Sequence, residues 1–348
     1  MCNIAGYVGE KQAAPILIEM LKRQQYFDGA ACAGIATLHN GKIYMRKVVG
    51  DVDTLINTTD ALYLPGNIGI AHTRPSGTPS TYAFAQPFVT SNGNMAGMTN
   101  GNASKDNSYA KRAQDALEFL QDDGYTFRDT AFENQGSFPV LRDGSYVSCV
   151  DVRLGLVDRY ARDMSVPCAL AQMASDMHVD NVFSVLSKDT PDRFYVLRTT
   201  RPSVVASTKD GTYMASTRFA FDDDIAENAI DLPLLRTCEI TKHGIIESNA
   251  EMNFKEVGKA TPEAFQKGYE AVKKRLYKMS CAPFCFGDVS HIVRDEAREY
   301  FTGNYDLFEY ANLAYNILYS LYKENSLKIE LGAVDGVKRY LMWVYDNK

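Results

Sequence analysis

The chain begins Met1-Cys2, and an apolar run containing two glycines follows directly, from Asn3 to Gly9. The apolar residues predict a buried strand, and the glycines allow another part of the structure to approach closely. Because Cys2 is small, we expect Met1 to be removed, which places the thiol beside a free α-amine with a pKa near ~8. One residue then carries both a nucleophile and its base. A lone Cys2 is most often inert, so the strand behind it makes this opening informative.

Composition excludes several classes of function. The chain has 348 residues, 45% of them hydrophobic, and a net charge of −6, so it can bury a large core but has no basic footprint for nucleic acid. We find no signal peptide and no membrane-spanning run, and we expect a cytoplasmic protein. Seven cysteines make no disulfide framework. Cys281 and Cys285 lack a second ligand pair, and there is no nucleotide-binding glycine motif, so we expect no metal and no cofactor.

Three further segments carry candidate site residues. Residues 67–73 predict a buried strand that ends at Arg74, whose planar guanidinium suits a bidentate contact with a carboxylate. A second strand-like run ends at Asn100 and Gly101, which offer a side-chain amide and a backbone N–H to an oxyanion. Asp151 lies in the first turn of a predicted helix. Alone, each has an ordinary explanation: a solvated arginine, an Asn-Gly turn and a helix-start aspartate.

Together these segments resemble the class II glutamine amidotransferases, whose glutaminase domains use an N-terminal nucleophile, as in glucosamine-6-phosphate synthase. The resemblance rests on Cys2 with the strand behind it, Gly69-Ile70-Ala71-His72-Thr73-Arg74 and Thr99-Asn100-Gly101, in the family's order. It implies that Cys2 attacks a glutamine side-chain amide while Asn100 and Gly101 hold the oxyanion. Arg74 and Asp151 would then bind the α-carboxylate and the α-ammonium of glutamine. We expect His72 to pack or hydrogen-bond rather than transfer protons.

The chain departs from the family pattern in two places. Asn3 stands where the family has Gly, and the loop over residues 75–88 lacks the family's Trp and His while keeping Pro87. These differences leave the substrate more open than the reaction type. One alternative is an N-terminal nucleophile amidohydrolase acting on another linear amide, and another is a non-catalytic scaffold. Arg74 favours a substrate that carries a carboxylate.

The rest of the chain sets the architecture. Short strand-like runs after residue 182 predict a meander, and periodicity alone indicates an α+β fold. The resemblance implies a four-layer αββα N-terminal nucleophile hydrolase sandwich over residues 1–255. Residues 256–348 have helical spacing with a break over 325–336, so we expect a helical C-terminal extension. It carries no recognisable synthase motif. The resemblance thus implies a separate synthase subunit that accepts the ammonia, and a homo-oligomer is a further expectation.

Overall fold

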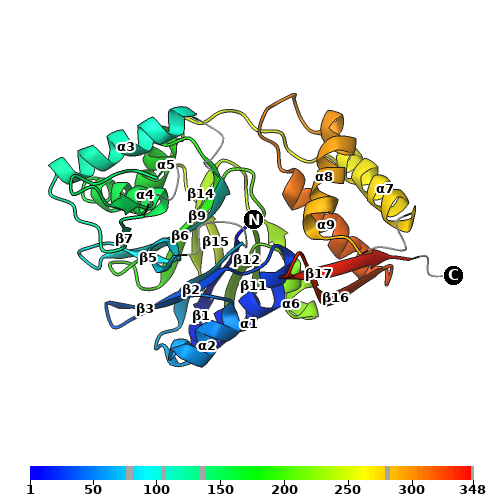
Figure 1. Ribbon diagram of the computed structural model, residues 1–348, viewed down its shortest axis with the longest axis horizontal. Coiled ribbons are helices and arrows are strands. Elements are labelled where there is room, and N and C mark those ends of the chain that lie inside the picture. The colour runs from blue at the N-terminus through cyan, green and yellow to red at the C-terminus, as the bar shows by residue number, and fades with distance from the viewer. Residues whose placement is uncertain (76–80, 103–106, 134–137, 279–282, 346–348) are drawn as a thin grey trace.

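Two antiparallel sheets pack face to face between two layers of helices (Figure 1). The computed structural model describes residues 1–75, 81–102, 107–133, 138–278 and 283–345, and every count below refers to these residues. The order of layers is helix, sheet, sheet, helix, as predicted for an N-terminal nucleophile hydrolase. The Thr78 region of the 75–88 loop and Cys281 lie outside the described residues.

The first sheet contains the N-terminal strand, β1, at its centre. Its seven strands follow the order β13-β11-β12-β1-β4-β2-β3. The Asn-Gly turn after β2 has a positive φ of 49° at Asn40 and 70° at Gly41, the conformation that a two-residue hairpin requires. The strands are β1 Asn3–Gly9, β2 Cys32–His39, β3 Lys42–Val49, β4 Ile68–Arg74, β11 Val204–Thr208, β12 Gly211–Ala215 and β13 Ile230–Asp231.

The second sheet follows the order β15-β14-β10-β9-β6-β5. It packs closely on the first sheet: a Cβ atom on Gly6 of β1 would lie 2.7 Å from the ring of Phe194, so only glycine fits there. Its strands are β5 Phe88–Val89, β6 Met95–Asn102, β9 Asp180–Ser187, β10 Arg193–Arg198, β14 Arg236–Thr241 and β15 Gly244–Glu247. A separate small pair joins β7 Thr130–Ala131 to β8 Tyr146–Val147.

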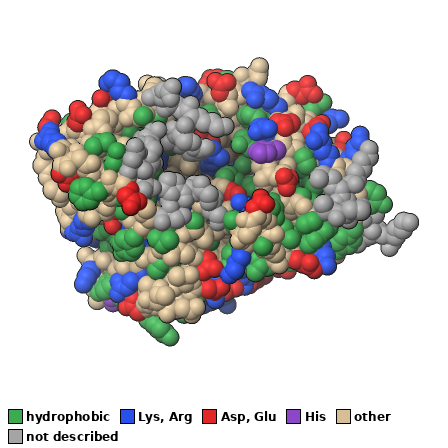
Figure 2. Space-filling view, in the orientation of Figure 1, with side chains coloured by type: hydrophobic (Ala, Val, Ile, Leu, Met, Phe, Trp, Pro, Cys, Tyr) green, Lys and Arg blue, Asp and Glu red, His purple; other side chains and the backbone are tan. Residues whose placement is uncertain are grey.

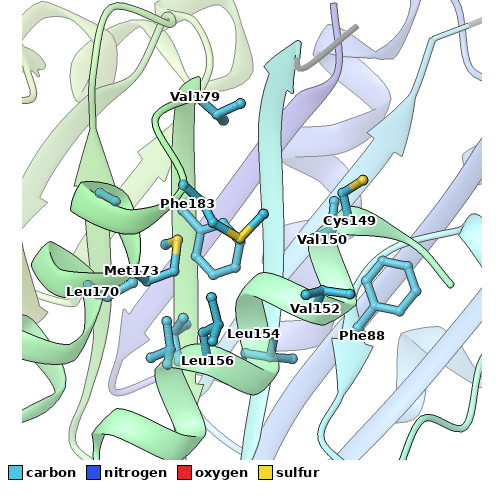
Figure 3. Packing of buried hydrophobic residues seen from close by; sticks show 14 of the residues in the cluster. Phe88, Cys149, Val150, Val152, Leu154, Leu156, Leu170, Met173, Val179 and Phe183 are labelled. Atoms are coloured by element: carbon cyan, nitrogen blue, oxygen red, sulfur yellow. The ribbon is translucent and has the colours of Figure 1, made fainter. Parts of the chain in front are cut away.

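Helices cover the outer face of each sheet. α1 (Ala13–Gln24) and α2 (Val52–Thr58) cover the first sheet, while α3 (Asn107–Asp122), α4 (Cys149–Tyr160) and α5 (Val166–Asp176) cover the second. Figure 3 shows Val152 of α4 beside Phe88 of β5, and Leu154 and Leu156 of α4 on the side of Phe183 of β9. All five side chains are buried, so α4 is fixed against the sheet along its length.

The C-terminal region lies beside the sandwich and contains three further helices. Its helices are α7 (Pro262–Lys278), α8 (Phe286–Ala297) and α9 (Tyr310–Lys323). The helices end before residues 325–336, as predicted, but this segment belongs to an antiparallel hairpin of β16 (Leu327–Val334) and β17 (Val337–Val344) that was not predicted. The extension is therefore helical with a terminal β-hairpin, and β17 lies beside the N-terminal segment of the chain (Figure 1).

Short elements complete the chain, and its surface carries both charge signs. These elements are α6 (Asp223–Glu227) and the 3₁₀ turns η1 Gln25–Phe27, η2 Ala61–Tyr63, η3 Tyr82–Phe84, η4 Arg218–Ala220 and η5 Arg298–Tyr300. Figure 2 shows acidic and basic side chains interspersed over the described part of one face. No helix among the described residues is both long and apolar enough to cross a membrane.

Candidate functional site

Strand register brings Cys2 to Arg74. β1 and β4 run antiparallel with Asn3 opposite Thr73, so the residue before β1 meets the last residue of β4. On the other side of β4, Arg74 pairs in register with Cys32 at the start of β2. Two thiols and one guanidinium therefore gather at the same end of the first sheet. Of the predicted site residues, Cys2 and Arg74 are the pair that register places side by side.

The charges around Cys2 act against the cost of its burial. Burial raises the pKa of the Cys2 thiol, and the N-terminal ammonium, Arg74 and Arg201 lower it in part. Arg201 is itself held by Asp180, with 2.7 Å between its Nε and the carboxylate. Since a thiolate is the reactive form of cysteine, these cations favour the form that attacks.

The amino terminus lies against the C-terminal hairpin. The Met1 ammonium is paired with the carboxylate of Asp28, and the Met1 side chain is 15% exposed. The same carboxylate accepts a hydrogen bond from Arg339 of β17 at 3.1 Å. Burial lowers the pKa of the Met1 amine to about 5, with Arg201 and Arg339 lowering it and Cys2 raising it. Burial and the two arginines thus favour a neutral amine, and the pairing with Asp28 acts in the opposite direction.

His72 connects the two sheets close to this point. Its ring Nε2 lies 3.1 Å from the backbone oxygen of Thr99, and because a carbonyl only accepts, Nε2 carries the proton. Burial, with a smaller effect from Arg74, lowers the pKa of His72 to about 3. The ring is therefore neutral and serves as a hydrogen-bond donor, the role predicted for it. This contact sets the end of β6 against β4, next to the strand that follows Cys2.

Asn100 and Gly101 occupy the end of β6. Asn100 is 1% exposed, and its side-chain Nδ2 has no hydrogen-bond partner among the described residues. A buried donor without a partner is costly, and an oxyanion that enters only during reaction would satisfy it. A Cβ atom on Gly101 would lie 2.9 Å from the backbone oxygen of Asp180, so this position also requires glycine.

Asp151 lies in a different charge cluster. It is 3% exposed in the first turn of α4, and burial, with the neighbouring Asp129, raises the pKa of its carboxyl to about 8. Lys47 offsets this in part, and its ammonium pairs with Asp129 at 2.7 Å. The charged groups that shift the pKa of Asp151 are Asp129, Lys47 and Arg128, and neither Cys2 nor Arg74 is among them. The link is indirect, since Lys47 also lowers the pKa of Cys32, which burial raises.

The Asn3 side chain, which replaces the family's Gly, points into the structure. Its Nδ2 lies 3.3 Å from Oγ1 of Thr73 and 3.5 Å from the backbone oxygen of Gln25. Successive side chains of a strand point to opposite faces, so Asn3 points away from the face of Cys2. The described residues contain no cluster of three His, Cys, Asp or Glu side chains that could hold a metal.

Four charged residues of this region were not singled out from the sequence. They are Asp28, Lys47, Asp129 and Arg201. Arg201 is a cation near Cys2, and Lys47 is a cation near Cys32. Asp129 pairs with Lys47, and Asp28 pairs with the amino terminus. Their partners are distant in sequence or come from irregular segments, so no local spacing marks them.

Comparison with known proteins gives two consistent likenesses. The chain is 30% identical over 224 residues to glutamine–fructose-6-phosphate aminotransferase (isomerizing) of Pyrococcus horikoshii, covering 64% of this chain and 33% of that protein. It is 31% identical over 218 residues to the same-named protein of Caldanaerobacter subterraneus, covering 62% and 31%. The chain resembles the class II glutamine amidotransferases. It spans about one third of the length of these relatives, and no family model matches it.

Solved structures give the same fold. Glutamine phosphoribosylpyrophosphate amidotransferase from B. subtilis superposes with a TM-score of 0.58 at 17% identity, covering 80% of this chain and 58% of that one. A structure titled as the allosteric regulatory enzyme of purine biosynthesis gives a TM-score of 0.60 at 18% identity, with the same coverage. The sequence likeness is thus to proteins named glutamine–fructose-6-phosphate aminotransferase, and the structural likeness is one of fold.

Proposed function

We propose that this chain, once Met1 is removed, hydrolyses the side-chain amide of glutamine through a thioester on Cys2. The observation that carries the proposal is the meeting of Cys2 and Arg74 at one end of the first sheet. A nucleophile and a group suited to a carboxylate lie side by side there, in a chain whose relatives have glutamine in their names.

The proposed reaction has two stages. The α-amine of Cys2 takes the thiol proton as the sulfur attacks the amide carbon. The resulting oxyanion accepts hydrogen bonds from Nδ2 of Asn100 and from the backbone N–H of Gly101. The C–N bond then breaks, the amine returns its proton to the leaving nitrogen, and ammonia departs. Water cleaves the thioester, which releases glutamate and restores the thiol.

The amino-acid end of glutamine needs two contacts. We assign its α-carboxylate to Arg74, whose guanidinium suits a bidentate contact. We assign its α-ammonium to Asp151, the buried carboxyl beside Lys47 and Asp129. Because burial holds the pKa of Asp151 near 8, entry of the cation must lower this pKa for the carboxylate to form. Substrate binding would therefore release a proton at neutral pH.

The deciding experiment measures glutamate release from glutamine after intact mass has shown that Met1 is lost. Cys2→Ala should abolish the release. Cys168→Ala is the matched control, because Cys168 is an exposed thiol on α5, and it should keep the full rate. Release that persists without Cys2, or no release from protein that lacks Met1, would contradict the proposal. In the second case other linear amides become the substrates to test.

The second candidate is a non-catalytic scaffold. In such a scaffold Met1 would stay on the chain, with its amine paired with Asp28. Intact mass of the protein purified from its native source distinguishes the two. Retained Met1 would block the α-amine and support the scaffold.

The ammonia acceptor is proposed to lie on a separate synthase subunit. We propose residues 1–255 as the glutaminase domain and residues 256–348 as an extension whose helices α7–α9 receive that subunit. Native mass spectrometry of cell extract should show a complex with a second protein. Finding the chain alone under gentle conditions would count against this arrangement.

A further inference from the structure

The C-terminal hairpin reaches the amino terminus through one carboxylate. Asp28 contacts the Met1 ammonium and also accepts a hydrogen bond from Arg339 of β17 at 3.1 Å. These partners come from opposite ends of the chain. The Asp28 side chain is 22% exposed, so the contact is partly shielded from water.

The hairpin is held in place by contacts on both sides of Arg339. The ring of Tyr340 packs edge-on against Phe27, with centroids 5.0 Å apart, and its hydroxyl donates to the backbone oxygen of Lys22 at 3.2 Å. Lys338 lies at the more exposed rim, 3.4 Å from Asp51. These contacts hold the backbone of β17 on either side of Arg339, and the Arg339 guanidinium reaches Asp28 from there.

Removal of Met1 moves the free α-amine by one residue, about 3.8 Å along the chain. Since Asp28 contacts the Met1 ammonium, its carboxylate stays within about one residue's length of the new amine. An unshared carboxylate at this distance would favour the protonated amine and raise its pKa, by about 1–3 units, which would impair a base. Arg339 counters this effect, because it takes up part of the carboxylate's charge and adds a positive charge of its own.

We propose that Asp28 and Arg339 form a positioning pair, in which Asp28 orients the α-amine of Cys2 and Arg339 keeps that amine neutral. The inference rests on the proposed function and extends it to the C-terminal hairpin. The other charged or titratable groups that face the amino terminus are Cys2, Arg74 and Arg201 with its partner Asp180. The hairpin is then part of the catalytic arrangement, although it lies 311 residues from Asp28.

The test uses full-length protein lacking Met1 and the pH dependence of kcat/KM for glutamine. Arg339→Ala should move the acidic limb of the profile upward by about one pH unit, because the amine then becomes a stronger base. Asp28→Asn should move the limb downward. Arg339→Lys restores a cation and should return the profile toward that of the unsubstituted protein. Loss of packing alone would not shift the limb in opposite directions.

Lys338→Ala is the matched control, since it removes a neighbouring cation of β17 that pairs with Asp51. It should leave the profile unchanged, and thermal melting identifies any variant that fails to fold. A readout independent of glutaminase activity is the pH dependence of α-amine acetylation by acetic anhydride, followed by peptide mass. It should shift in the same directions. If both Asp28→Asn and Arg339→Ala keep the original acetylation profile, the inference is overturned. If acetylation shifts but no variant releases glutamate, the proposed function fails while the positioning pair stands.

Discussion

Replacing Asp151 with Asn should stabilise the protein at neutral pH. Asp151 is 3% exposed, and burial with Asp129 raises the pKa of its carboxyl from 3.8 to about 8. The unfolded chain loses this proton near pH 4, whereas the folded chain keeps it until about pH 8. Between these values the folded state binds more protons than the unfolded state. Stability therefore falls as pH rises through this window.

The size of the effect follows from the shift. One pKa unit corresponds to about 1.4 kcal/mol, so a rise from 3.8 to about 8 sets an upper limit of about 6 kcal/mol. Asn keeps the shape of the side chain and never ionises. We expect Asp151→Asn to gain about 2–4 kcal/mol over the unsubstituted protein at pH 8, and almost nothing at pH 4.

Urea unfolding at several values between pH 4 and pH 8 measures this difference directly. The control is Asp163→Asn, just beyond the end of α4, whose carboxylate is 70% exposed and whose replacement should change stability by less than about 0.5 kcal/mol. A gain that does not grow with pH, or a loss at pH 8, would refute the reasoning. If Asp151 also binds the α-ammonium of glutamine, the stabilised variant should show a raised KM.

Asn100→Ala should lower kcat about 100-fold, because one oxyanion donor is lost. It should leave the melting temperature nearly unchanged, because a buried donor without a partner is removed. Activity and melting curves together check this, and a large fall in melting temperature with full activity would contradict it. Glu309→Gln should destabilise the fold by about 3–5 kcal/mol, because it leaves Arg198 without its charge partner. Arg198 is 2% exposed and lies 2.8 Å from the Glu309 carboxylate. Urea unfolding measures the loss, and a neutral result would show that the pair is dispensable. His72, whose pKa burial lowers to about 3, should show no titration between pH 5 and pH 8 by NMR, and a midpoint inside that range would disprove its neutral state.

The strands that carry the site could be predicted because their signals are local. Apolar runs mark β1, β4 and β6, and the Asn40-Gly41 turn marks the hairpin between β2 and β3. The register of β1 on β4 then follows from a sheet that must bury both strands. Cys2 and Arg74 are therefore brought together by features that sequence alone displays.

Two elements were missed although a signal was present. Leu327, Ile329 and Leu331 alternate in β16, and Asp335-Gly336 forms its turn with positive φ values of 51° and 76°, a typical hairpin pattern. Helix α3 likewise carries buried side chains at helical spacing, at Tyr109, Ala113, Leu117 and Leu120. In both segments the pattern was overlooked rather than absent.

The charge partners could not be predicted from spacing. Lys47 pairs with Asp129 and Arg198 with Glu309, across 82 and 111 positions of the chain. Such pairs depend on which loops and strands meet after folding, and a single sequence contains no local periodicity that encodes them. The surroundings of Asp151 belong to the same class, since its neighbours Asp129 and Lys47 come from distant parts of the chain.

The contact between Asp28 and Arg339 also orders events in time. At a synthesis rate of about 5–20 residues per second, roughly 15–60 s separate the translation of these two residues. During that interval the hairpin has not been made, and the first residues of the nascent chain stay open to the enzyme that removes methionine. Once β17 docks, Met1 is largely covered. We therefore expect processing of the amino terminus to precede the docking of β17, and a slow aminopeptidase to leave a fraction of molecules capped.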